Sequence, residues 1–183
     1  EVLQFKPQPD DQSIYDFLIF NRTNHTERTF FKNIKKLPHS HNIVIKGKDV
    51  SVSRWYDLRK KVKNAFNNET EFIESLLLSI KQQLRSDVPV GACLSGGLDS
   101  STIVSLILKY FNKPDIHTFS AVYEKGMKGD ESDFIEEFTD LVRNMHFTKP
   151  TADSLLNEID TYVEAMVEPI PGTSEYAEFK VME

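Results

Sequence analysis

The chain has 183 residues, of which 39% are hydrophobic, and a formal net charge of −6. This length allows one domain, or one domain and part of another. An acidic chain argues against a nucleic-acid or membrane-surface protein, since both depend on clustered Lys and Arg. No apolar run approaches the roughly 20 residues that span a bilayer, and the single cysteine excludes an internal disulfide. We expect a cytoplasmic protein.

The first part of the chain, residues 1–58, is expected to form a small α+β region. Residues 13–20 have the character of a short helix. Residues 41–46 and 50–56 are candidate strands around a Lys-Gly-Lys-Asp turn, which is a hairpin signal. The polar, asparagine-rich segment 59–68 is interpreted as a domain linker.

The remainder, 69–183, is expected to be a second domain with a parallel sheet. Apolar residues recur at helical spacing over 72–84, with Asn68 as N-cap and Glu71 three residues later. A strand over 88–94, a helix over 101–111 and a strand over 116–123 follow. This βαβ order favours an α/β fold with parallel strands and a right-handed crossover.

Two further helices are predicted near the end of the chain. Asp130 is a candidate N-cap for a helix that reaches Met145, and Thr151 for one that reaches Met166. The apolar stripes of both helices are interpreted as core packing.

The most informative segment is Ser95-Gly96-Gly97-Leu98-Asp99-Ser100, between the strand over 88–94 and its helix. Glycines let the main chain approach a ligand closely, and the first N–H groups of a helix favour anions. The serine hydroxyls add donors. The glycine spacing and the missing lysine exclude a Walker A loop and a dinucleotide fingerprint. The segment predicts a phosphate site.

This segment resembles the pyrophosphate-binding loop of the ATP pyrophosphatases, the PP-loop superfamily. Its flanks resemble the synthetase domain of glutamine-hydrolysing asparagine synthetases, and earlier segments resemble the end of the N-terminal nucleophile amidotransferase domain of that family. The segments that carry the resemblance are 86–91, 118–124, 130–132, Glu168-Pro169, 29–34, Leu37-Pro38 and 54–57. The resemblance implies an incomplete PP-loop domain of the adenine nucleotide α-hydrolase type over 69–183. Residues 1–58 would be the end of a glutaminase-like domain.

The reaction that the resemblance implies is ATP-dependent amide formation. A substrate carboxylate, aspartate in this family, attacks ATP to give an acyl-adenylate and pyrophosphate, and ammonia from glutamine then displaces AMP. Three alternatives stay open: amidation of another acceptor such as a surface-polysaccharide sugar acid, closure of a lactam ring, and a non-catalytic assembly domain. The expected partners are small molecules, with a homodimer as an open alternative.

The candidate pyrophosphate cradle consists of Ser95, Gly96, Gly97 and Ser100. Asp99 is the candidate catalytic and metal-binding residue, because Mg²⁺ is held by one or two carboxylates together with substrate phosphates. The competing interpretation of Asp99 is a helix N-cap.

The resemblance assigns three further positions. It places adenine against the main chain of Leu94 and Ala121, and Glu168 near the acceptor or the ammonia entry. Val167 stands where the family has aspartate, so that match is partial.

Three acidic or thiol side chains are instead given structural interpretations. Asp130 and Glu131 are explained by the helix dipole, which favours acidic residues in a first turn. Cys93 is interpreted as a buried, inert strand residue rather than a nucleophile.

The resemblance also predicts that the chain is part of a larger protein. Residue 1 is Glu, whereas the glutaminase nucleophile of the family is an N-terminal cysteine, and Glu183 precedes the second glycine-rich acidic segment of the family. By itself the chain is therefore expected neither to hydrolyse glutamine nor to turn over ATP.

Overall fold

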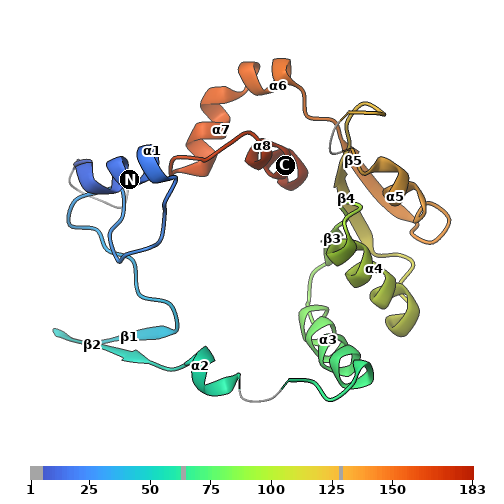
Figure 1. Ribbon diagram of the computed structural model, residues 1–183, viewed down its shortest axis with the longest axis horizontal. Helices are drawn as coiled ribbons and strands as arrows, with labels where there is room; N and C mark the ends of the chain where they lie inside the picture. The colour runs from blue at the N-terminus through green and yellow to red at the C-terminus, as the bar shows by residue number, and fades with distance from the viewer. Residues whose placement is uncertain (1–5, 63–64, 128–129) are drawn as a thin grey trace. The chain divides into compact units, whose positions relative to one another are not determined.

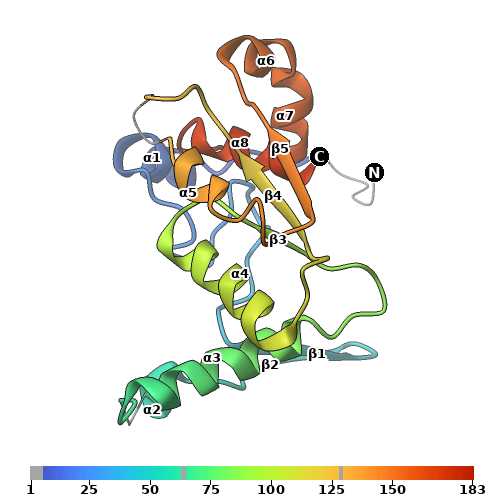
Figure 2. The same ribbon diagram turned by 90° about the vertical axis from the view of Figure 1, so that its right-hand side faces the viewer.

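The computed structural model describes residues 6–62, 65–127 and 130–183. The chain divides into two compact units, Glu1–Ala65 and Phe66–Glu183, called unit 1 and unit 2 below. Figures 1 and 2 trace their elements in chain order. In the described part of the chain, no helix has both the length and the apolar character needed to cross a membrane.

The described part of unit 1 contains two short helices and one hairpin. Helix α1 (Asp11–Phe20) begins at Asp10, whose carboxylate accepts a hydrogen bond from the Ser13 N–H at 3.0 Å. The predicted hairpin is confirmed, with β1 (His41–Lys46) antiparallel to β2 (Asp49–Arg54). The single-turn helix α2 (Leu58–Lys61) follows it.

Unit 2 is built on the predicted parallel sheet. Its three strands have the order β3-β4-β5, and both pairings are parallel. The elements up to the second strand are α3 (Glu69–Gln83), β3 (Gly91–Cys93), α4 (Leu98–Phe111) and β4 (His117–Ala121). Asn68 caps α3 by accepting from the Glu71 N–H at 2.9 Å, as its sequence predicts.

The long helix predicted from Asp130 to Met145 is wrong. Only a short helix α5 (Ser132–Glu136) forms there, and the chain then enters strand β5 (Asn144–Thr148). Residues 144–148 form a strand rather than a helix because β4 offers a complete row of parallel hydrogen-bonding partners from His117 to Ala121.

The helix predicted after Thr151 is present but interrupted. Thr151 caps it through a reciprocal pair of hydrogen bonds with Ser154. The helix divides at Glu158 into α6 (Ala152–Asn157) and α7 (Ile159–Met166). Leu156 and Val163 are 68% and 56% exposed, so the prediction of a continuous core stripe is wrong at these positions. A last helix, α8 (Ser174–Met182), was not predicted.

The core of unit 2 lies between the sheet and its helices. Helices α4 and α5 lie on one face of the sheet and α8 on the other (Figures 1 and 2). The buried residues of this core are Ile80, Leu94, Val104, Ile107, Ile116, Ile135, Phe138 and Val142. Because strand, loop and helix all contribute to it, the core fixes the position of the loop after β3.

Candidate functional site

The loop after β3 starts from a firmly held residue, Leu94. Its side chain is fully buried, and its N–H donates to the Phe119 carbonyl oxygen at 2.9 Å. Its own carbonyl oxygen accepts from the Ser120 hydroxyl at 2.6 Å. Leu94 therefore anchors the loop, and only its carbonyl oxygen, through a second lone pair, retains hydrogen-bonding capacity for an adenine ring.

Two serine hydroxyls close the loop over the start of α4. The hydroxyl oxygens of Ser95 and Ser100 lie 3.0 Å apart, and the Ser95 N–H donates to the Ser100 hydroxyl at 3.1 Å. The Gly97 N–H points to the Ser95 hydroxyl at 3.3 Å. The loop thus brings the hydroxyls of Ser95 and Ser100, from its two ends, close together.

The beginning of α4 has no side-chain cap. Gly97 is the N-cap residue, and no side chain there accepts a hydrogen bond from the first turn. The first N–H groups of α4 are therefore available to an anion, with the positive end of the helix dipole behind them. Asp99 lies inside this first turn, so the alternative that it caps the helix is wrong.

Asp99 has the features of a cation ligand. It is exposed, and no hydrogen bond or ion pair joins its carboxylate to the rest of the described chain. Among the described residues there is no group of three or more side chains that could hold a metal by itself. A single free carboxylate beside a phosphate site is compatible with Mg²⁺, which takes its remaining ligands from phosphates and water.

A cavity of about 370 Å³ opens next to the loop, at the carboxyl ends of β3 and β4. This volume lies in the range of small-molecule sites. Parallel α/β sheets bind ligands at this edge. Three predicted residues, Leu94, Ser95 and Ala121, line it together. The other lining residues are Cys93, Phe119, Tyr123, Glu131, Ala177, Glu178, Val181 and Met182.

Cys93 corrects the sequence analysis. It is exposed rather than buried and lies in the wall of this cavity. The residue that follows β3 explains the difference, since Leu94 points into the core while Cys93, its neighbour in the chain, faces the opposite side of the sheet.

Glu131 lies at the start of α5 as its N-cap residue, in agreement with its interpretation as an acidic residue at a helix start, and it also contacts the loop. A side-chain carbon added to Gly96, whose φ is +87°, would lie 2.6 Å from the Glu131 carbonyl oxygen. Only glycine fits this contact, so the segment around Glu131 packs directly on the loop. The Asp-Glu-Ser motif at 130–132, which contributes to the family resemblance, is the one feature of the sequence that draws attention to this segment.

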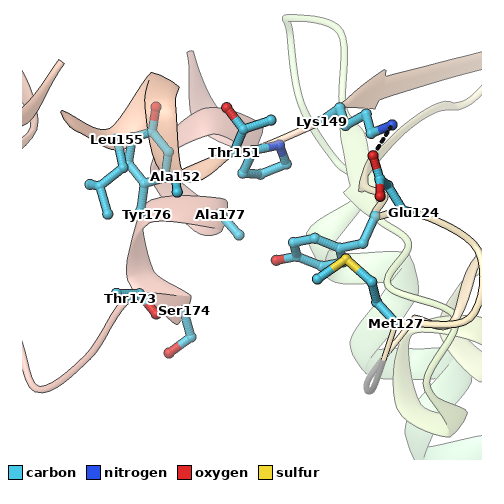
Figure 3. A pocket seen from close by; sticks show the side chains of 12 residues that line it. Glu124, Met127, Lys149, Thr151, Ala152, Leu155, Thr173, Ser174, Tyr176 and Ala177 are labelled. Atoms are coloured by element: carbon cyan, nitrogen blue, oxygen red, sulfur yellow. Dashed lines mark ion pairs between the residues drawn. The ribbon is translucent and has the colours of Figure 1, made fainter. Parts of the chain in front are cut away.

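A second, larger cavity of about 550 Å³ adjoins the first and shares Tyr123 and Ala177 with it. Figure 3 shows one wall formed by α6 and α8 and the other by Lys149, Glu124 and Met127. The Lys149 ammonium lies 3.8 Å from the Glu124 carboxylate. Although larger, this cavity contains no predicted site residue and lies away from the loop, so we assign the candidate site to the smaller one.

A polar cluster holds α8 against α7. The Tyr176 hydroxyl donates to the Glu158 carboxylate at 2.8 Å, and the Lys180 ammonium lies 3.2 Å from it. The hydrogen bond from Tyr176, followed by that from Lys180, lowers the pKa of Glu158. This cluster keeps in place the helix that covers the cavity.

Glu168 is not brought to the site. It follows α7 and is absent from the residues that line either cavity in the described structure. The preceding residue, Val167, has a φ of 62°, a conformation that a β-branched residue rarely adopts. The backbone just before Glu168 is therefore strained.

The comparisons with known proteins agree with this geometry. The model of the asparagine synthase family matches residues 71–183, which include the loop and both cavities. The chain belongs to the asparagine synthase family. This family uses ATP, which fits the uncapped helix and the cavity beside it.

The chain is also similar to longer curated proteins. It is 31% identical to a putative glutamine-hydrolysing asparagine synthetase 2 of Methanocaldococcus jannaschii, with 85% of this chain and 31% of that protein covered. It is 29% identical to asparagine synthetase 3 of Bacillus subtilis, with 79% and 26% covered. The amidase chyE of Penicillium rubens is 23% identical over 79% of this chain and 24% of that protein. The chain therefore spans about a third or less of these relatives.

Proposed function

We propose that the chain is the ATP-binding part of an amide ligase of the asparagine synthetase type. The observation that carries the proposal is the arrangement around the loop. An uncapped helix start, two adjoining serine hydroxyls and a cavity lined by Leu94, Ser95 and Ala121 lie together at one sheet edge. The pyrophosphate of ATP would lie on the loop and the adenosine in the cavity.

The residues of the loop have separate roles in this proposal. A carboxylate oxygen of the substrate attacks the α-phosphorus of ATP, and the bond to the β-phosphate breaks with its electron pair leaving on pyrophosphate. The N–H groups at the start of α4 and the hydroxyls of Ser95 and Ser100 stabilise that charge, an effect worth several kcal/mol when donors are fixed in advance. Asp99 would hold Mg²⁺, which offsets the charge of the phosphates.

The acceptor and the amide donor are also proposals. Aspartate is the first candidate acceptor, with glutamine as the source of ammonia, because the named relatives include glutamine-hydrolysing asparagine synthetases. A different acceptor is the second candidate, because two fungal relatives are named amidases. Residues 1–58 would be the end of the glutaminase domain. Pyrophosphate release by the full-length protein, compared between aspartate and other carboxylates, decides between the acceptors.

Cys93 supplies a direct test of the nucleotide site. It is the only cysteine of the chain and lies in the wall of the proposed adenosine cavity. Bound ATP should shield it, so its alkylation by iodoacetamide should slow about tenfold when ATP with Mg²⁺ is present at ten times its dissociation constant. Asp99→Asn, which leaves the cavity unchanged, should require more ATP for the same protection. An alkylation rate that saturating ATP leaves unchanged would disprove the site.

A further inference from the structure

The side-chain charge around the candidate site is the opposite of what an anionic ligand requires. Of the described residues that line the cavity beside the loop, Glu131 and Glu178 are acidic, and none is basic. Asp99 adds a third carboxylate at the start of α4. Polyphosphate, the ligand of the proposed function, is strongly anionic, so these side chains would repel it when it is free of metal.

Glu131 is the acidic residue nearest to the loop. Its carboxylate lies 3.6 Å from the position that a side-chain carbon on Gly97 would take, and the Ser95 hydroxyl lies 3.3 Å from the same position. The Glu131 carboxylate and one of the loop hydroxyls are thus neighbours of the same glycine. A phosphate on the loop would lie close to this carboxylate.

The position of Glu131 is fixed by its main chain rather than by its side chain. Its carbonyl oxygen accepts from the N–H groups of Phe134 and Ile135, and it faces Gly96 at the close approach described above. The carboxylate itself has no hydrogen-bond or ion-pair partner in the described structure. Neither a structural contact nor a neighbouring cation therefore offsets its charge.

We propose that Glu131 makes the loop selective for metal-bound polyphosphate over the metal-free form. This inference rests on the proposed function, since it concerns the same site. When Mg²⁺ accompanies the phosphates, the carboxylate faces a neutralised ligand and its repulsion is offset. When the metal is absent, the negative charge of Glu131 opposes binding. Glu131 is a specificity-determining residue, and no metal ligation by it is required.

The test compares binding of inorganic pyrophosphate with Mg²⁺ and with EDTA, measured by calorimetry on the whole chain. Glu131→Gln should strengthen binding of metal-free pyrophosphate by roughly fivefold or more, the effect of a unit charge about 4 Å away even in water. The preference for the magnesium form should fall by the same factor. Glu178→Gln should have a smaller effect in the same direction.

The matched control is Glu137→Gln, which removes the same charge from an exposed residue just after α5 and outside the cavity. It should leave the preference unchanged. Glu131→Asp, which keeps the charge, should also keep it. The ratio of the two affinities is the readout, because a loosened loop would weaken both forms together.

Two results would overturn the inference, and they differ in what they say of the function. If Glu131→Gln keeps the wild-type ratio, Glu131 has no role in selectivity while the nucleotide site stands. If the wild-type chain binds neither form of pyrophosphate and ATP does not protect Cys93, the proposed function fails and the inference with it.

Discussion

The two units of the chain are stabilised in different ways. Unit 2 has a continuous core that includes Leu94 and Ile107, both almost fully buried. In unit 1, the hairpin side chains Ile43, Ile45 and Val52 are at least half exposed. The described buried residues there are only Phe30, Asp10 and Thr29. A two-stranded hairpin without such a core is marginally stable by itself.

This difference explains where the candidate site lies. A phosphate loop works only when its N–H groups and hydroxyls are held in place before the ligand arrives. In unit 2 the core holds Leu94 on one side of the loop and Ile135, four residues after Glu131, on the other. Unit 1 is organised instead by local polar contacts such as the Asp10–Arg28 ion pair at 2.8 Å.

The largest expected effect comes from removing core volume in unit 2. Ile107, on α4, is 3% exposed, whereas Ile45, in the hairpin, is 64% exposed. Ile107→Ala should lower the free energy of unfolding by about 3 kcal/mol, because it leaves a cavity in the core. Ile45→Ala should change it by less than about 0.5 kcal/mol. Urea unfolding followed by circular dichroism measures both, and equal losses would contradict the contrast between the units.

A second pair of substitutions compares two glycines with left-handed conformations. Gly96, in the loop of unit 2, faces the Glu131 backbone, whereas Gly47, in the hairpin of unit 1, has no atom within 4 Å of an added carbon. Gly47→Ala should cost about 1 kcal/mol of unfolding free energy, from backbone strain alone. Gly96→Ala should cost about 2 to 3 kcal/mol, because a steric clash adds to the strain.

The same pair of glycines separates folding from binding. Gly96→Ala should abolish the protection of Cys93 by ATP, since the loop would have to shift away from Glu131. Gly47→Ala should leave that protection at the wild-type level. If both substitutions cost the same stability and both preserve protection, the loop is not held by the contact between Gly96 and Glu131.

The sequence predicts the elements whose signals are local. The cap at Asn68, the hairpin turn at Gly47 and the apolar strand before Ser95 each contain their own evidence within a few residues. The candidate phosphate loop also has a local signal, because its glycines and serines are contiguous, although its ligand stays a prediction. These features could therefore be placed before the structure was known.

Features that depend on distant partners could not be placed in this way. Residues 144–148 are too few to distinguish strand from helix by periodicity, and β4 decides the outcome. The exposure of Cys93 depends on the cavity that remains between its face of the sheet and α8. The approach of Glu131 to Gly96 joins residues that are well separated in the chain, so the local pattern indicates only the interaction of Glu131 with a helix dipole.

The smallest expected effect is a local loss of order in unit 1 at low pH. Hydrogen bonds from the Arg28 guanidinium, and then from the Ser13 N–H, lower the pKa of Asp10 from 3.8 to about 2. A carboxylate whose pKa is lowered by folding stabilises the folded state at pH values above its pKa in the unfolded chain. This contribution is lost as the pH falls through its pKa in the folded state. Between pH 4 and pH 2, the protection of the amides over residues 8–32 against hydrogen exchange, taken relative to the intrinsic exchange rate at each pH, should therefore fall. Asp10→Asn should show low protection already at pH 7, with little further change in protection on acidification. Because Asp10 is both the cap of α1 and the partner of Arg28, the effect should stay within unit 1 and leave the protection of β3 and α4 unchanged. A loss of protection that spreads equally to unit 2 would mean that the two units do not unfold independently.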